Sequence, residues 1–151
     1  MLREQLTAAM KDAMRAKDTR ALGTVRLILA ALKDRDIAVR DKGNMDGVGE
    51  DEILSMLQTM IKQRQESIRL YEQGGRCELA EQEQEEIDVI RRFMPTPIEG
   101  DELETAVKTT IKEIGAADLK DMGRTMAALK ERYPGRMDFS KVSGIVRSSL
   151  V

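Results

Sequence analysis

Apolar residues recur every three or four positions along most of the chain, which is the spacing of an amphipathic helix. In the first half of the sequence this pattern predicts four helices, at residues 2–16, 19–40, 50–73 and 77–94. Asp18 is placed to cap the second helix, since a short acidic side chain can accept a bond from the first free N–H groups. The stretch "DKGNMDGVG" at 41–49 holds three glycines and indicates a flexible loop before the third helix.

A segment with two prolines divides the pattern. "MPTPIEGDE", residues 94–102, forbids a continuous helix, because each proline lacks an N–H and restricts the residue before it. Three shorter helices are predicted after it, at 101–114, 118–133 and 139–150, with Gly115 ending the first and Asp138 or Ser140 capping the last. We therefore expect an all-α fold with two domains: an antiparallel bundle of about four helices in residues 1–94, and a small three-helix domain in residues 95–151.

The composition agrees with a helical protein. Apolar residues make up 41 % of the chain and charged residues 34 %, with two Phe, two Tyr and no Trp. Sheets are enriched in aromatic and β-branched residues, whereas helices favour Leu, Met, Ala, Glu, Lys, Arg and Gln. The ten methionines fit a core built from adaptable, unbranched side chains.

Two residue types needed for common catalytic sites are missing or nearly so. The chain has no histidine and a single cysteine, Cys77. These counts leave no zinc site, Ser-His-Asp triad or Cys-His pair. Neither GxxxxGK[ST] nor GxGxxG occurs, so no phosphate-binding loop is indicated. We expect no catalytic residue, no metal ligand and no cofactor.

The same cysteine count bears on the compartment. One cysteine excludes an intramolecular disulfide and fits a reducing environment. The N-terminal stretch "MLREQLTAAMKDAMRAKD" carries charges every few residues and lacks the apolar centre of a signal peptide. No run of 18 apolar residues occurs, so no membrane span is expected. These features lead us to expect a cytoplasmic protein.

The net charge of −2 hides an uneven distribution. Residues 1–49 hold ten Lys/Arg against seven Asp/Glu, and residues 118–151 hold seven against four, so each segment is +3. Residues 77–104 hold two against ten, a charge of −8. An anionic partner is therefore permitted at either end of the chain and disfavoured in the middle.

Basic side chains gather in the last two predicted helices and the turn between them. Proteins bind the phosphate backbone of nucleic acids through clustered Lys and Arg side chains. The candidate phosphate-contacting residues are Lys120, Arg124, Lys130, Arg136, Lys141 and Arg147. The alternative, that these are merely solvated helix faces, stays open. Tyr133 lies on the apolar stripe, so base stacking is disfavoured and a folded or duplex RNA backbone is the better ligand.

Two residues are expected to have structural roles. Arg64 shares a stripe with Leu57 and Ile61, so its charge should be paired, with Asp18, Asp34 or a glutamate of the fourth helix. Gly123 interrupts a helical pattern at a cost of about 1 kcal/mol relative to alanine. We expect it to allow the close approach of a neighbouring helix, with direct ligand contact as the alternative.

Three stretches resemble the GatB/YqeY family: "VRLILAALKDRDI", "IKQRQESIRLYEQGGRCELAEQEQEEIDVIRRFMP" and "DMGRTMAALKERYPGRMDFSKVSGIVRSSL". The resemblance runs through essentially the whole chain in order. It implies a stand-alone relative of the C-terminal tail of the glutamyl/aspartyl-tRNA amidotransferase B subunit: a helical bundle followed by a small three-helix domain. In that enzyme the tail contacts the outer, elbow side of tRNA, and the chemistry takes place in other domains.

The resemblance therefore implies a non-catalytic module that binds tRNA or a tRNA-handling complex. A protein–protein adaptor is the first alternative. An auxiliary factor in glutamine-dependent tRNA amidation is the second, since the family is associated with carbon–nitrogen ligase activity that uses glutamine as amido donor. The residues of this chain offer no machinery for that reaction, and they do not specify an oligomeric state.

Overall fold

The computed structural model describes residues 1–151 and confirms an all-helical protein, with seven α-helices, one short 3₁₀ helix and no strand. The chain forms two compact units, Met1–Met94 and Pro95–Val151, which are described separately below. None of the helices combines the length and the apolar character needed to cross a membrane.

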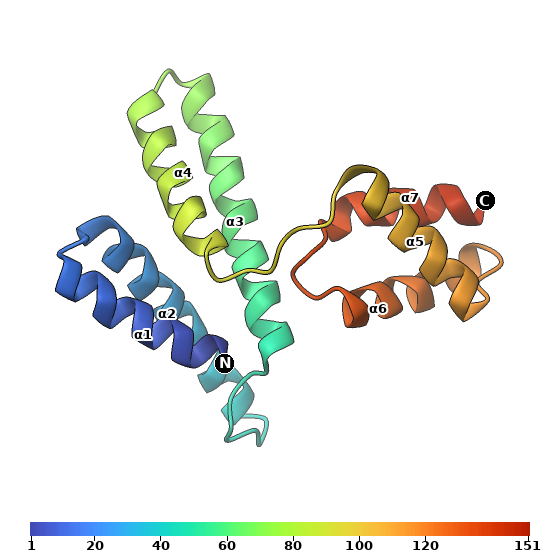
Figure 1. Ribbon diagram of the computed structural model, residues 1–151, viewed down its shortest axis with the longest axis horizontal. Helices are drawn as coiled ribbons and strands as arrows, with labels where there is room; N and C mark the ends of the chain where they lie inside the picture. The colour runs from blue at the N-terminus through green and yellow to red at the C-terminus, as the bar shows by residue number, and fades with distance from the viewer. The chain divides into compact units, whose positions relative to one another are not determined.

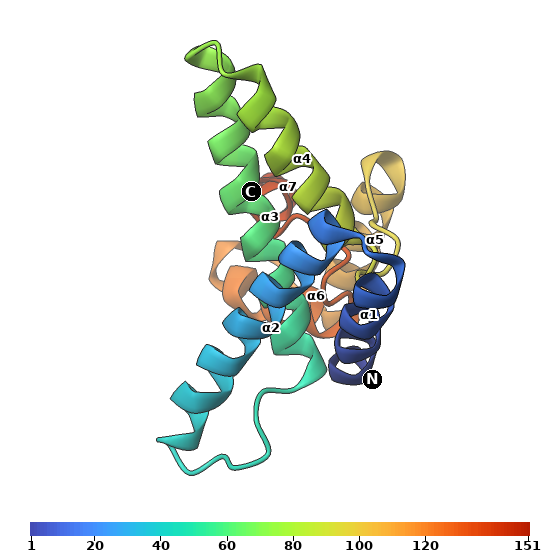
Figure 2. The same cartoon turned by 90° about the vertical axis from the view of Figure 1, so that its left-hand side faces the viewer.

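The N-terminal unit contains four helices: α1 (Leu2–Ala16), α2 (Thr19–Arg40), α3 (Glu50–Gln73) and α4 (Cys77–Arg91). Consecutive helices pair as hairpins, α1 with α2 and α3 with α4 (Figure 1), and α2 also packs on α4. Figure 2 shows that α2 is inclined to α3. The four helices thus form two crossed hairpins, and the antiparallel bundle that we expected is not confirmed.

The core of this unit comes from the apolar stripes read in the sequence. All four helices contribute buried side chains to one apolar cluster. Five of these side chains have no exposed surface: Leu6, Ile28, Leu57, Ile87 and Ile90. Burial of a Leu or Ile side chain contributes about 1.5–3 kcal/mol, so this cluster is the main stabilising element of the unit.

The helix ends of the N-terminal unit follow the predicted signals with one difference. Asp18 caps α2, since its Oδ1 accepts a hydrogen bond of 3.1 Å from the Ala21 N–H. Helix α4 ends at Arg91, three residues earlier than expected, and a hydrogen-bonded turn continues to Met94. The reason is Pro95, which disfavours helical backbone in the residue before it.

A polar junction joins α1, α2 and the following loop. The Arg3 guanidinium donates to both carboxylate oxygens of Asp36, at 2.6 and 2.7 Å, and to the Val48 carbonyl at 2.7 Å. Asp36 also accepts a bond of 2.9 Å from the Val48 N–H. Beside this junction Gly47 has a φ of +87°, and a Cβ there would lie 2.6 Å from Asp36 Oδ1. The loop can pass this close only because residue 47 is a glycine.

The C-terminal unit contains α5 (Gly100–Ile114), the 3₁₀ turn η1 (Leu119–Asp121), α6 (Met122–Arg132) and α7 (Phe139–Leu150). Each of the three α-helices packs against the other two (Figure 1). The three helices share one apolar core, in which four side chains have no exposed surface: Val107, Leu129, Val142 and Val146. Gly115 ends α5 with a φ of +70°, as expected, and Asp138 is the cap of α7.

The segment that precedes α5 belongs to the core of this unit. The Ile98 N–H donates to the Arg136 carbonyl at 2.7 Å, and the Arg136 Nε donates to the Thr96 carbonyl at 3.0 Å. Ile98 itself is only 4 % exposed and packs in the cluster with Val107 and Val142. Two non-helical segments are thereby held together at one end of the three helices.

Candidate nucleic-acid interface

Three of the six candidate phosphate-contacting residues make contacts within the C-terminal unit. Arg124 donates to the Ile114 carbonyl at 2.8 Å and forms an ion pair with Asp121 at 3.2 Å. Asp121 in turn accepts a bond of 2.8 Å from the Ala117 N–H. That bond and the Arg124 guanidinium hold the pKa of Asp121 below its ordinary value. Arg124 therefore fastens the connection between α5 and α6.

Arg136 and Lys130 are also engaged. The Arg136 guanidinium is bonded to the Thr96 carbonyl, and the residue is only partly exposed. The Lys130 Nζ lies 5.9 Å from the centre of the Phe139 ring, within the range of a cation–π contact that links α6 to α7. Phosphate binding by these two side chains would compete with contacts that stabilise the unit.

The other three candidates, Lys120, Lys141 and Arg147, are exposed, and their side chains form no hydrogen bond or ion pair. They lie on two elements, the 3₁₀ turn η1 and helix α7. Lys141 and Arg147 are six residues apart on α7, which places them about 120° apart around the helix axis. Lys120 lies on the 3₁₀ turn, where its backbone N–H donates to the Asp118 cap. Of the six candidates, these three are thus the ones whose side chains make no internal contact.

Sequence reasoning missed a pair of lysines on α5. Lys108 and Lys112 are exposed, four residues apart on the same side of the helix, and without a hydrogen-bond or ion-pair partner. Arg132, by contrast, is paired with Glu113 and lies 3.4 Å from the Thr110 hydroxyl. The four-residue spacing of the two lysines was the available signal.

Arg64 is paired as a structural residue should be. Its side chain is 13 % exposed, and Nε donates to Glu86 Oε2 of α4 at 2.8 Å. A second bond of 3.1 Å runs from the guanidinium to the Met60 carbonyl. Glu83 lies nearby, and its pKa is raised, first by burial and then by the Glu86 charge, against an opposing effect of Arg64. This cluster joins α3 to α4.

The expectation for Gly123 is wrong. The residue is exposed, and a Cβ built there would meet no atom within 4 Å. No neighbouring helix approaches it, because the helices that pack on α6 do so on the side of Thr125 and Leu129, which are fully buried. The packing role proposed for this glycine is therefore withdrawn.

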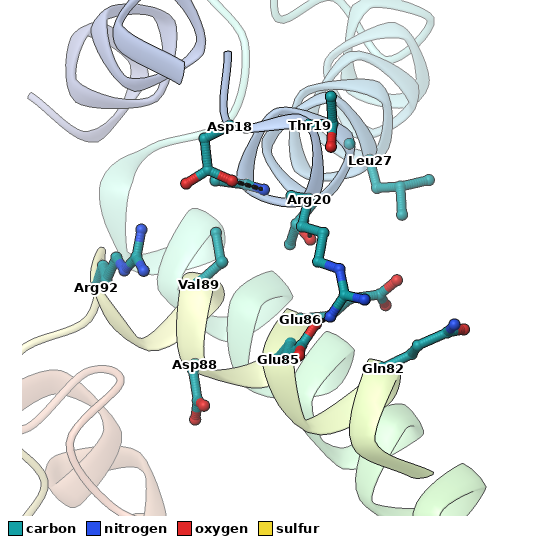
Figure 3. A pocket seen from close by; sticks show the side chains of 13 residues that line it. Asp18, Thr19, Arg20, Leu27, Gln82, Glu85, Glu86, Asp88, Val89 and Arg92 are labelled. Carbon is teal, nitrogen blue, oxygen red and sulfur yellow. Dashed lines mark hydrogen bonds and ion pairs between the residues drawn. The ribbon is translucent and has the colours of Figure 1, made fainter. Parts of the chain in front are cut away.

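The N-terminal unit has an open pocket of about 500 Å³ between α2 and α4 (Figure 3). Arg20 of α2 reaches across it to Glu85 of α4 and forms an ion pair. Arg92 and Asp18 lie at one end, and Leu27 at the other side points away from α4 (Figure 3). The lining mixes both signs of charge, but four carboxylates face two guanidinium groups, so the pocket is net negative and disfavours an anion.

The comparisons with known proteins agree on one family. The sequence profile described as YqeY-like protein matches residues 3–150. The relatives include altered inheritance of mitochondria protein 41, mitochondrial, of Saccharomyces cerevisiae, which is 29 % identical over 137 residues, 91 % of this chain and 70 % of the relative. The protein of the same name from Clavispora lusitaniae is 35 % identical over 120 residues, 78 % of this chain and 66 % of the relative. The one from Eremothecium gossypii is 38 % identical over 85 residues, 56 % and 44 % of the two chains.

These relatives contradict the cytoplasmic location that we expected from the sequence, because they are mitochondrial proteins by name. The expectation rested on one unpaired cysteine and a charged N-terminal stretch. A lone cysteine is compatible with any compartment in which thiols stay reduced, so it does not single out the cytoplasm. The expected location is therefore withdrawn.

Proposed function

The chain belongs to the YqeY-like protein family, and on this basis we propose that its C-terminal unit binds tRNA through the phosphate backbone. The observation that carries the proposal is the set of exposed cations without a partner on three elements of this unit. They are Lys108 and Lys112 of α5, Lys120 of η1, and Lys141 and Arg147 of α7. Cations that make no internal contact are free to replace the counterions of a polyanion.

The available groups indicate backbone contact without base recognition. The unit has two aromatic residues, Tyr133 and Phe139, and both pack against its core. Sequence-specific binding to single-stranded RNA relies on exposed rings on which bases stack. The expected ligand is therefore a folded RNA, recognised by its shape and its phosphates.

The test is a titration of fluorescently labelled, unfractionated tRNA with the full chain, followed by anisotropy at several salt concentrations. The variant Lys120→Ala/Lys141→Ala/Arg147→Ala should weaken binding at least tenfold and should reduce the slope of log K against log[salt] by about 2. A matched control removes three exposed cations of the N-terminal unit that have no partner: Arg35→Ala/Lys42→Ala/Arg91→Ala.

Equal affinity of the first variant and the wild type would overturn the proposal. A loss of the same size in the control variant would also overturn it, because the effect would then follow net charge and not position. Capture of protein partners that survives nuclease treatment, without tRNA binding, would favour the adaptor alternative.

A further inference from the structure

Helix α2 carries a row of exposed cations along one side. Arg26, Lys33 and Arg40 are seven residues apart, which is two helical turns, so they share a face of the helix. All three are exposed, and none of their side chains forms a hydrogen bond or an ion pair. We call these three residues the α2 basic row.

A groove of about 410 Å³ lies beside the row, between α1 and α2. Lys33, Ile37 and Arg40 line it from α2, and Arg3 and Thr7 line it from α1. Asp36 is its one acidic residue, and its carboxylate is already bonded to Arg3 and to the Val48 N–H. The groove therefore has a net positive charge, in contrast to the mixed lining of the pocket between α2 and α4.

The spacing of the row restricts the kind of ligand. With a rise of 1.5 Å per residue, neighbouring cations are about 10 Å apart along the helix, and Arg26 and Arg40 are about 21 Å apart. Three side chains separated in this way cannot converge on one phosphate group or one nucleotide. They can contact successive phosphates of an extended polyanion.

We propose that the α2 basic row and the adjoining groove form a second contact surface for the RNA backbone, located in the N-terminal unit. The inference rests on the proposed function for the identity of the polyanion, and it adds a site that is separate in the chain from the C-terminal cations. Binding is then shared by the two units, and the full salt dependence reflects cations of both.

The experiment uses the full chain and unfractionated tRNA, with the variant Arg26→Ala/Lys33→Ala/Arg40→Ala. The control is Arg35→Ala/Lys42→Ala/Arg91→Ala, which removes the same charge from the same unit and leaves the row intact. Circular dichroism and thermal unfolding confirm that both variants are folded; these exposed side chains have no hydrogen-bond partner to lose. The row variant should bind at least tenfold more weakly, with a salt slope lower by about 2, and the control should bind within about twofold of wild type.

The outcomes separate this inference from the proposed function. If the C-terminal triple variant loses affinity and the row variant does not, the proposed function stands and the second surface is overturned. If only the row variant loses affinity, the second surface stands and the C-terminal assignment fails. If the wild type does not bind tRNA, both the proposed function and the second surface are overturned. The same holds if the wild type binds phosphatidylglycerol vesicles through the α2 basic row and does not bind tRNA.

Discussion

Arg3 and Asp36 form a two-pronged ion pair, with distances of 2.6 and 2.7 Å, that ties the first turn of α1 to the last turns of α2. Their side chains are 34 % and 20 % exposed, so the pair is partly shielded from water. Asp36 also accepts a hydrogen bond from the Val48 N–H, and this bond fixes the end of the 41–49 loop. One carboxylate therefore orders three segments.

Asp36→Asn should destabilise the protein by about 2 kcal/mol, since bonds to charged groups contribute more than neutral ones. Urea unfolding at pH 7 measures this loss. Glu66→Gln is the control, because Glu66 pairs with Arg69 on an exposed helix face, where water screens the pair and the loss of stability should be much smaller. Equal effects of the two variants would contradict the role assigned to the junction.

The same pair predicts a pH dependence. The hydrogen bond from Arg3 holds the pKa of Asp36 below its ordinary value of 3.8, despite the opposing effect of burial. A carboxyl whose folded-state pKa is depressed contributes its full stability above the unfolded-state pKa and loses it as the pH falls through the folded-state pKa. The difference in unfolding free energy between wild type and Asp36→Asn should therefore be constant from pH 7 to about 5 and shrink below pH 4.

Gly47→Ala should be more damaging than Gly43→Ala. Both glycines have a positive φ, +87° and +96°, so each alanine carries the cost of a left-handed backbone, about 1–2 kcal/mol. Only at Gly47 would the Cβ collide with the Arg3–Asp36 pair; at Gly43 it meets nothing within 4 Å. Thermal unfolding should show a clearly larger loss for Gly47→Ala, and equal losses would mean that the close approach is unimportant.

Arg64→Ala should cost about 3 kcal/mol, because it leaves Glu86 without its cation in a partly buried place. Arg69→Ala, which breaks an exposed pair on the same helix, should cost much less stability than Arg64→Ala. Denaturant unfolding of both variants provides the comparison. A small effect at Arg64 would show that α3 and α4 are held by apolar contacts alone.

Glu83→Gln should stabilise the protein at pH 7, by less than about 1 kcal/mol. Burial and the Glu86 charge raise the pKa of Glu83, so the folded state binds its proton more tightly than the unfolded state does. The ionised side chain is then unfavourable above the folded-state pKa, and the gain from glutamine should vanish as the pH falls below 4.5, the ordinary value. Glu81→Gln, on the exposed side of α4, is the control and should change little.

Most of the secondary structure could be predicted because its signals are local. The caps Asp18 and Asp138, the αL residue Gly115 and the prolines after Met94 each act on backbone within a few positions. The helix expected over 118–133 is divided for a reason that is equally local but easily missed. Asp118 accepts from the Lys120 N–H and tightens the first turn into a 3₁₀ helix, so α6 begins only at Met122.

The candidate site was less predictable because the partners of charged groups are distant in sequence. The sequence shows Arg124 on a helix and Arg136 in the turn after it, but it does not show that they bond to the carbonyls of Ile114 and Thr96. In the same way, the pattern around Gly123 shows a glycine in a helix and does not show which side the neighbouring helices occupy. Such questions depend on tertiary packing.

The hairpin arrangement of the N-terminal unit has a kinetic consequence. Its largest interfaces join helices that follow each other in the chain, α1 with α2 and α3 with α4. Forming contacts between elements that are neighbours in the chain costs little loop-closure entropy, and helical proteins rich in such contacts fold in microseconds to milliseconds. In the C-terminal unit, by contrast, the Ile98–Arg136 bond closes a long loop, so the segment from Thr96 to Ile98 should be the last part of that unit to become ordered during refolding.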